Sequence, residues 1–317
     1  MSPAEFKPVR RRIDSLDIAR TLALIAMAVY HFTWDLEFFG YVARGLTGHG
    51  GWKLFARGIA SSFLFLVGVS LVLAHARGIR WRPFAKRLAQ VVAGAAAITV
   101  VTYFTTPNAF VFFGILHQIA FASLVGLLFL RLPFPITALL GAAIIATPFL
   151  VSTPLTNSRW LAWIGLPERQ PLSNDLVPVL PWFGVVLLGI AFARLAQRVG
   201  WIEKLRALGP APRWLQPAAL LGRHTLLFYL LHQPILFGLV WAFAQVAPPD
   251  PIQRFQADCR QSCLVERDAA FCDRYCACAQ ADLASRKLLD RLMNGSLGEA
   301  DRDAVREVVE ECSFGAR

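Results

Sequence analysis

Long apolar stretches separated by short polar segments dominate the first 247 residues. A membrane-spanning helix needs about 20 mostly apolar residues, and seven stretches approach or reach that length. They are Ile18–Phe39, Phe55–Ala74, Leu88–Phe104, Ala109–Leu130, Pro135–Val151, Leu176–Leu195 and Thr225–Val246. The fifth is short and flanked by proline, so its status as a true span stays open. The pattern predicts an all-α, polytopic membrane helical bundle of about seven spans.

Composition supports this interpretation. Hydrophobic residues make up 56% of the chain and charged residues only 17%, with a mean hydropathy of +0.49. A soluble domain usually carries about 25% charged residues, so too few polar residues are present to cover a water-facing surface. The composition excludes an ordinary soluble globular protein and, with 24 Phe and 9 Trp, a disordered one.

Charge and cysteine content change near residue 250. Residues 1–249 hold 22 Lys/Arg against 8 Asp/Glu, whereas residues 250–317 hold 10 against 13 and all six cysteines. The sequence therefore predicts a transmembrane domain over residues 1–247 and a small Cys-rich helical tail over 252–317. The sequence pI of 9.9 does not indicate nucleic-acid binding, because the basic residues lie in short loops between apolar stretches.

Loop charges predict the orientation. With the N-terminus (Lys7, Arg10, Arg11, Arg12) in the cytoplasm, sixteen basic residues fall on the cytoplasmic side of the seven spans and five on the other side. The five are Arg44, Lys53, Arg57, Arg159 and Arg169. The loop-charge rule favours this orientation. An odd number of spans then places the tail outside, and we expect a bacterial inner membrane with a periplasmic tail.

The cysteines indicate disulfides. Cys259 and Cys263, and then Cys272 and Cys276, are two i, i+4 pairs, which lie on one face of a helix. A helical hairpin favours the pairs Cys259–Cys276 and Cys263–Cys272, which leaves Cys278 for Cys312. Bridges of this kind persist outside the cytoplasm. The alternative is a zinc site, but the tail has no histidine and its spacing is loose for zinc, so we expect no metal.

A second pattern lies near the end of the tail. Ser296 and Glu299 have the spacing of a capping box. They predict the start of a helix with Val305, Val308, Val309 and Cys312 along one stripe.

Titratable residues inside spans are costly and are candidates for function. Arg20, His31 and Asp35 belong to the first span. Arg20 and His31 share one helix face about 16 Å apart along the axis. His31 and Asp35 are i, i+4, so the carboxylate is expected to orient the imidazole of a general base. A buried polar cluster that holds helices together is the structural alternative.

Other polar residues stand out less. His49 lies in the glycine-rich loop after the first span, where a lone histidine is often only solvated. His117 with Gln118, and His232 with Gln233, enter later spans, where each pair can bind substrate or simply link helices. His224 and His75 are expected at the inner boundary and surface. No P-loop, GxSxG, HExxH or dinucleotide motif is present.

The stretch from Arg12 to His31, with Leu16-Asp17 and Arg20-x10-His31, resembles the opening of the transmembrane acyltransferase superfamily. Three later segments are similar to the heparan-alpha-glucosaminide N-acetyltransferase catalytic-domain family. They are Ser61 to Ser70, Phe113 to Gln118, and Gly222 to His232 with Tyr229. The sequence departs from the pattern at Thr21, where the family has glycine, in its fewer spans, and in the Cys-rich tail.

The resemblance implies an integral membrane acyltransferase. By position, the residues that carry acetyl transfer in the family's lysosomal member fall on His31 and His49. The implied donor substrate is acetyl-CoA from the cytoplasm, and the implied acceptor is a hydroxyl or amine of a glycan or envelope molecule on the outer side. We expect Asp35 to orient His31, and Arg20, His117, Gln118, Tyr229 and His232 to bind donor or acceptor.

The remaining partner predictions are membrane lipid, a possible homodimer and no nucleic acid. The alternative function is a non-enzymatic transporter or flippase that uses the same intramembrane His, Asp and Arg residues.

Overall fold

The computed structural model describes residues 13–43, 45–264 and 266–316, apart from the side chain of Gln261. The basic N-terminal residues and Arg44, used above to predict orientation, lie outside the described residues. The described residues form helices and no β-strand, with three isolated bridges. The predicted all-α class is confirmed.

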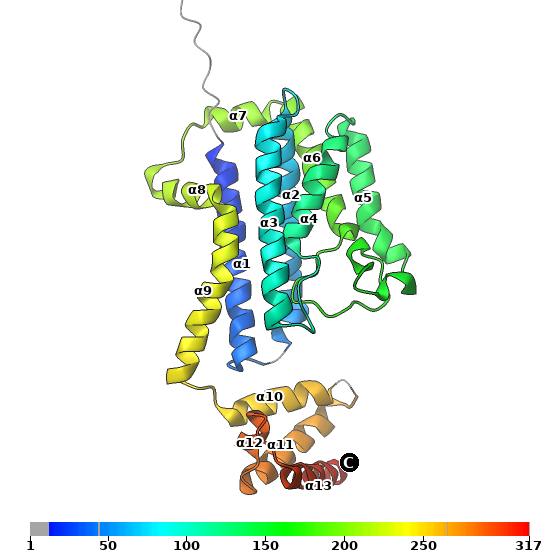
Figure 1. The fold of residues 1–317 in the computed structure, drawn as a ribbon, viewed down its shortest axis with the longest axis vertical. Coiled ribbons are helices and arrows are strands. Elements are labelled where there is room, and N and C mark those ends of the chain that lie inside the picture. Colours follow the sequence, from blue (N-terminus) through cyan, green and yellow to red (C-terminus); the bar gives the residue numbers. More distant parts are fainter. Residues whose placement is uncertain (1–12, 44, 265, 317) are drawn as a thin grey trace, which may run out of the picture. The chain divides into compact units, whose positions relative to one another are not determined.

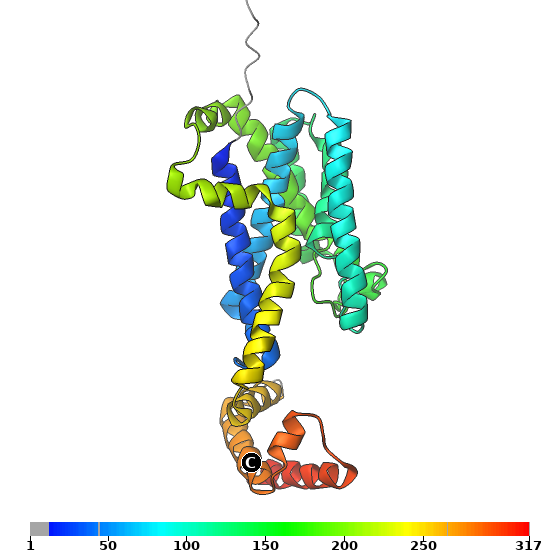
Figure 2. The same ribbon diagram turned by 60° about the vertical axis from the view of Figure 1, so that its left-hand side comes forward.

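Five described helices are long and apolar enough to cross a membrane. They are α1 (Asp14–Phe39), α2 (Gly50–His75), α3 (Trp81–Thr105), α6 (Val179–Arg198) and α9 (Thr225–Val246). Figures 1 and 2 show how these helices run. They correspond to the first, second, third, sixth and seventh predicted spans. α2 begins earlier than predicted, at Gly50 and not Phe55.

The fourth and fifth predicted spans fall on shorter apolar helices. They are α4 (Ile115–Gly126), continued by η2 (Leu127–Phe129), and α5 (Phe134–Leu150). α4 does not begin at Ala109, because residues 109–113 form an irregular segment. The carbonyl oxygens of Ala109 and Phe113 accept hydrogen bonds from the backbone N–H groups of Asn174 and Val177, at 2.8 and 3.0 Å. The count of seven spans stays a prediction.

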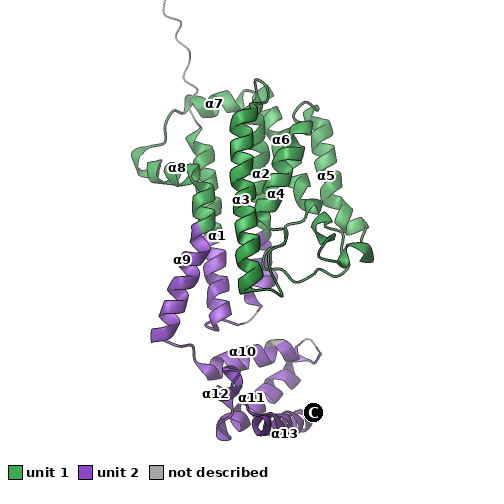
Figure 3. Cartoon of the chain, in the orientation of Figure 1, with its two compact units in different colours: residues 1–27, 57–230 green, residues 28–56, 231–317 purple. Residues whose placement is uncertain are grey.

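The chain divides into two compact units (Figure 3). Unit 1 contains the described residues up to Met27 and Arg57–Leu230, and unit 2 contains Ala28–Ala56 and the residues from Leu231 onward. The division cuts through α1, α2 and α9, so residues 231–250 group with the tail. The predicted domain boundary near residue 250 stays a prediction.

Glycines let the helices of unit 1 pack closely. A Cβ added at Gly68 of α2 would lie 2.1 Å from the carbonyl oxygen of Val186 in α6. One added at Gly189 of α6 would lie 2.2 Å from the carbonyl oxygen of Phe65. Around these contacts Leu64, Val186 and Ile190 are fully buried. The α2–α6 contact therefore depends on residues without side chains.

Short elements complete unit 1. They are η3 (Pro154–Asn157), η4 (Ala162–Ile164), α7 (Trp201–Ala207), η5 (Arg213–Leu215) and α8 (Gln216–Arg223). In unit 2, η1 (Leu46–Gly48) precedes α2, and the tail consists of α10 (Pro251–Cys263), α11 (Ala269–Ser285), α12 (Leu289–Met293) and α13 (Glu299–Gly315).

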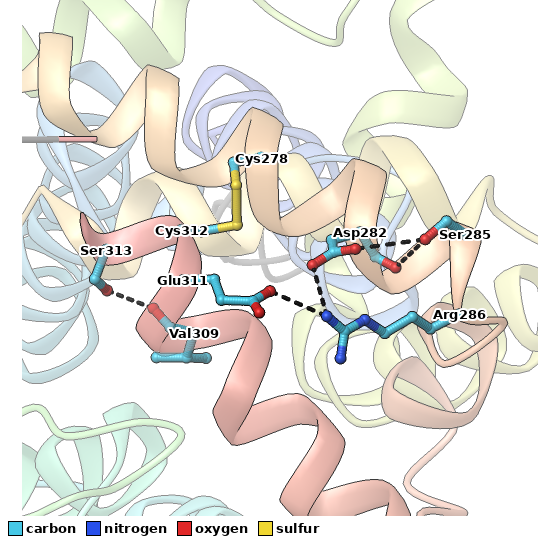
Figure 4. Close-up of a disulfide and its surroundings, with 8 residues drawn as sticks. All are labelled: Cys278, Asp282, Ser285, Arg286, Val309, Glu311, Cys312 and Ser313. Carbon is cyan, nitrogen blue, oxygen red and sulfur yellow. Dashed lines mark hydrogen bonds and ion pairs between the residues drawn. A yellow bond between two sulfur atoms is a disulfide. The ribbon is translucent and has the colours of Figure 1, made fainter. Parts of the chain in front are cut away.

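Three disulfides cross-link the tail. The bridges are Cys259–Cys276, Cys263–Cys272 and Cys278–Cys312, the pairs that the helical hairpin favoured. The first two join α10 to α11, and the third joins α11 to α13. Figure 4 shows the third beside the ion pairs of Arg286 with Asp282 and Glu311. No described cysteine is free, so the zinc alternative has no thiol ligand.

The predicted capping box is wrong by two residues. α13 begins at Glu299 with Gly298 as N-cap, and the backbone N–H of Gly298 donates to Asp301 Oδ2 at 3.1 Å. Asp301 can reach back to the cap from the third helical position, which Glu299 at the first position cannot. Of the predicted stripe, Val308 and Cys312 are fully buried whereas Val309 is exposed.

Candidate functional site

A cavity of about 630 Å³ lies within unit 1. Helices α1, α2, α3, α4, α7, α8 and α9 each contribute to its lining. The volume lies within the range typical of small-molecule sites. The long apolar helices supply one wall, which includes Leu116, Ile119 and Leu226. α4 and α9 are apolar around most of their circumference, so the side chains that they turn toward the cavity are apolar too.

Five arginines line the cavity against one carboxylate, that of Asp17. The arginines are Arg20, Arg80, Arg87, Arg206 and Arg223. Arg20 comes from α1, Arg80 and Arg87 from the start of α3, Arg206 from α7 and Arg223 from α8. Guanidinium groups bind phosphate with bidentate geometry, so this lining favours an anionic, phosphate-bearing ligand.

Arg20 is fixed by contacts on two helices. One of its terminal nitrogens pairs with Asp17 one turn earlier on α1, and the other donates to Ser70 Oγ of α2 at 2.7 Å. Asp17 also lies 3.5 Å from Nε of Arg223 at the end of α8. This network positions two cationic side chains at the cavity lining.

A close approach of backbones holds α8 against α1. A Cβ at Gly222 would lie 1.9 Å from the carbonyl oxygen of Asp17. Thr21 Oγ1 donates to the carbonyl oxygen of Ala218 at 2.6 Å. Thr21, the departure from the family's glycine, therefore links α1 to α8 through its hydroxyl group.

Tyr229 and Arg20, two predicted binding residues, line the cavity. His117 and Gln118 do not. His117 joins helices: its Nε2 lies 3.2 Å from Thr99 Oγ1, and its Nδ1 accepts from the backbone N–H of Gly114 at 3.2 Å. Gln118 is fully buried, with both amide atoms lacking a hydrogen-bond partner among the described residues. For His117 the geometry matches the helix-linking alternative.

Unit 2 contains a separate polar cluster. The rings of His31 on α1 and His232 on α9 meet edge to face, 5.0 Å between centroids. Asp35 is fully buried, and its Oδ1 accepts a hydrogen bond from Gln233 Nε2 at 2.7 Å. Its Oδ2 has no hydrogen-bond partner among the described residues.

The expected hydrogen bond between Asp35 and His31 is therefore not formed. Gln233 takes the carboxylate because α9 packs beside α1 and presents an amide donor at this depth. His232, and not Asp35, lies against the imidazole of His31. The two rings are close enough for one ligand to contact both.

The loop after α1 places His49. Glu37 Oε2 accepts hydrogen bonds from the backbone N–H and the hydroxyl of Thr47, at 2.9 and 2.7 Å. Glu37 Oε1 accepts from the N–H of Gly45. His49 itself is exposed, and its Nδ1 lies 2.8 Å from the carbonyl oxygen of Gly45. Glu37 thus organises the turn that carries His49.

Asp175 is a further carboxylate that the sequence did not single out. It lies in the loop before α6, and its Oδ2 accepts from the backbone N–H of Ile115 at 2.9 Å. Burial raises the pKa of Asp175 to about 6. Asp175 Oδ2 thereby gives a partner to one of the backbone N–H groups at the N-terminus of α4, which lack partners within the helix.

Sequence reasoning also missed most of the cavity lining. Arg80, Arg87, Arg206 and Arg223 were counted only as loop charge, and His75, which lines the cavity, was assigned to surface. Their clustering at the edges of predicted spans was the available signal. His224, placed at the inner boundary, is exposed at the end of α8. Within the described residues no group of His, Cys, Asp and Glu has the arrangement of a metal site.

A family model described as heparan-alpha-glucosaminide N-acetyltransferase, catalytic, matches residues 12–234. This range contains every residue that lines the cavity, and also His31, Asp35, His49 and His232. The Cys-rich tail lies outside it. Searches of curated proteins and of solved structures find no match.

Proposed function

The chain belongs to the heparan-alpha-glucosaminide N-acetyltransferase catalytic family, and from this premise we propose that it transfers an acetyl group from acetyl-CoA to a glycan or envelope acceptor. Family membership implies membrane acetyltransferase activity. The donor, the acceptor and the sides of the membrane on which they bind are the proposal. The observation that supports this proposal most is the arginine-lined cavity of unit 1.

The cavity suits the donor for two reasons. The phosphates of CoA need several cationic partners, and five arginines surround one cavity with a single carboxylate. Its apolar wall suits the less polar pantetheine and acyl portion. Arg20 contributes a guanidinium already held by Asp17 and Ser70, so little side-chain entropy is lost on binding.

The chemistry is assigned to the polar cluster of unit 2. His31 would accept the proton of the acceptor amine or hydroxyl as that nitrogen or oxygen attacks the thioester carbonyl. The new N–C or O–C bond forms, the C–S bond breaks, and the CoA thiolate takes the proton back from the imidazolium. His232, 5.0 Å away between ring centroids, would stabilise the imidazole orientation, and His49 would contact the acceptor.

Loop charges support the proposed topology. Five spans, or seven if α4 and α5 also cross, both place the segment between α6 and α9 on the N-terminal side and the tail on the other. We propose a cytoplasmic N-terminus and a periplasmic tail in a bacterial inner membrane. A periplasmic reporter fused after Val246 should be active, and one fused within residues 77–87 silent; the reverse pattern would refute the topology.

The experiment on function measures free thiol released from acetyl-CoA by the purified chain, with glucosamine oligosaccharides as probe acceptors. Arg87→Gln should raise KM for acetyl-CoA at least about tenfold, the loss expected of one charge-assisted contact. Arg77→Gln is the matched control, because Arg77 lies exposed in the turn before α3 and does not line the cavity. Equal KM values for the two variants would contradict the donor site.

The His31 role is tested by the same assay. His31→Ala should lower kcat by about 10²–10⁴ while the KM for acetyl-CoA stays unchanged. Near-normal turnover would remove His31 from the mechanism. Absence of thiol release with every acceptor, together with solute movement across vesicles, would favour the transporter alternative.

A further inference from the structure

Residues 199–224 connect α6 to α9 and cannot themselves cross a membrane. α7 has 7 residues and α8 has 8, so at about 1.5 Å per residue neither reaches half of a bilayer. Figures 1 and 2 show both helices running crosswise to the long helices of unit 1, near the beginning of α1. A segment that leaves one span and enters the next at the same boundary lies along a membrane surface.

The exposed side chains of this segment suit that surface and not water. Trp214 is 77% exposed and Leu208 75%, and Trp201 and Leu220 are at least half exposed. The same segment carries Lys204, Arg206, Arg213 and Arg223 against Glu203. Tryptophan with basic residues on an amphipathic helix is typical of segments that lie in the interface of an anionic leaflet.

A cavity of about 520 Å³ lies within this segment. Arg213, Arg223 and Gln216 supply its polar lining, and Leu220 with two prolines supplies its apolar lining. Asp14 also lines it, but its carboxylate is occupied by Arg223 at 2.9 Å and by the N–H of Ala211 at 3.0 Å. The cavity therefore presents little negative charge.

Arg213 is available for a ligand. Among the described residues its side chain has no ion-pair or hydrogen-bond partner, and Trp214 beside it is exposed. Arg159, in another Arg-Trp pair of the chain, is by contrast engaged: its guanidinium lies 5.4 Å from the ring centroid of Phe110 and donates to the carbonyl oxygen of Asn108. A free guanidinium over a half-apolar cavity fits a phosphate linked to a hydrocarbon group.

We propose that this cavity binds the headgroup of an anionic phospholipid, with Arg213 on the phosphate and Trp214 and Leu220 in the acyl-chain boundary. The site shares Arg223 with the arginine-lined cavity proposed for the donor, but Arg213, Gln216 and Leu220 line only this one. It would fix the segment 199–224, and so the start of α1 and α9, at the membrane surface.

The test uses the full chain in detergent micelles with equal amounts of phosphatidylglycerol and phosphatidylcholine, and native mass spectrometry to count retained lipids. The wild-type chain should retain phosphatidylglycerol preferentially. Arg213→Gln should reduce that preference about fivefold, the factor that corresponds to about 1 kcal/mol per basic residue at an anionic surface. Arg213→Lys, which keeps the charge, should retain most of it.

The matched control is the double variant Arg159→Gln/Trp160→Ala, set against Arg213→Gln/Trp214→Ala. Trp160 is 87% exposed, so both double variants remove one Arg-Trp pair with an exposed tryptophan. Only the second should lose phosphatidylglycerol. Equal retention by the two would overturn the proposal. Displacement of the lipid by glycerol phosphate alone at equal concentration would overturn the lipid in favour of a soluble phosphate ligand.

Discussion

The helices of unit 1 and the Cys-rich tail are stabilised in opposite ways. In unit 1, α2, α5 and α6 meet at glycines, and a Cβ at Gly184 would lie 2.5 Å from the carbonyl oxygen of Gly141. Many large apolar side chains on these helices point outward, among them Leu139 at 71% exposed. The tail instead has a small core around Leu283, Leu288 and Val308, three disulfides and a set of surface ion pairs.

The difference follows from the solvent that each region meets. Lipid is as apolar as leucine, so burial of apolar surface contributes little to helix association, and close packing at small residues takes its place. A tail of fewer than 70 residues in water buries too little apolar surface to be stable alone and needs covalent links. Variants that add atoms should therefore damage unit 1 most, and variants that remove cross-links should damage the tail most.

The largest effect is expected at Gly68. Gly68→Ala would place a methyl group 2.1 Å from the backbone carbonyl oxygen of Val186 in α6. Because α6 is tightly packed and cannot move away, folded protein should be lost almost completely. Gly58→Ala on the same helix meets no atom within 4 Å and should be neutral or slightly stabilising. Yield of monodisperse protein by size-exclusion chromatography decides; normal yield from Gly68→Ala would contradict close packing as the basis of unit 1.

The next largest effect is expected in the tail. Cys278→Ala/Cys312→Ala opens a loop with a sequence separation of 34, and Cys263→Ala/Cys272→Ala one with a separation of 9. Loop entropy predicts that the free energy of unfolding of the tail falls by about 4 kcal/mol in the first variant and by about 2.5 kcal/mol in the second. Peptide-resolved hydrogen exchange in the tail should be faster than in the wild type, and more so for the first variant than for the second. The rate at which CoA thiol is released from acetyl-CoA should not change. Equal exchange in both variants would exclude loop entropy as the cause.

Asp175 tests how unit 1 tolerates charge. Burial raises its pKa from 3.8 to about 6. Between pH 4 and pH 6 the folded state therefore keeps a proton on Asp175 that the unfolded state has lost. Stability is then highest below pH 4 and falls as pH rises to 6 and above, by about 3 kcal/mol at most. Asp175→Asn keeps an acceptor for the N–H of Ile115 and should be more stable than wild type at pH 8 but equal at pH 4. The measurement is the melting temperature of both proteins at pH 4 and pH 8. The same difference between variant and wild type at both pH values would refute this.

The smallest effect is expected for the tail's surface charges. Arg286 pairs with Asp282, Glu307 and Glu311 at 3.3, 2.7 and 3.0 Å, which links α11 to α13. Exposed pairs contribute little and are screened by salt, so Arg286→Met should lower the melting temperature of the tail only slightly. The difference from wild type should vanish in 1 M NaCl; a difference that persists there would indicate a packing role for the side chain.

The sequence alone determined the helical class, the positions of the five long spans and the cysteine pairs. These features are local: a helix needs only an apolar stretch of sufficient length, and the i, i+4 spacing puts Cys259 with Cys263 on one face whatever surrounds them. The match to the family's opening motif, with Arg20 and His31, is likewise written in consecutive residues. The role of His31 stays a prediction.

Only the tertiary structure decided which side chains meet. Arg20, Arg87 and Arg223 line one cavity although about two hundred residues separate the first from the last. Asp35 accepts a hydrogen bond from Gln233 and not from His31, which is nearer in sequence. Spacing along one helix gives the face on which a residue lies, but not the donor that a neighbouring helix presents there. That choice depends on how closely backbones approach, and it is fixed at Gly68, Gly189 and Gly222, where the absence of a side chain allows contact.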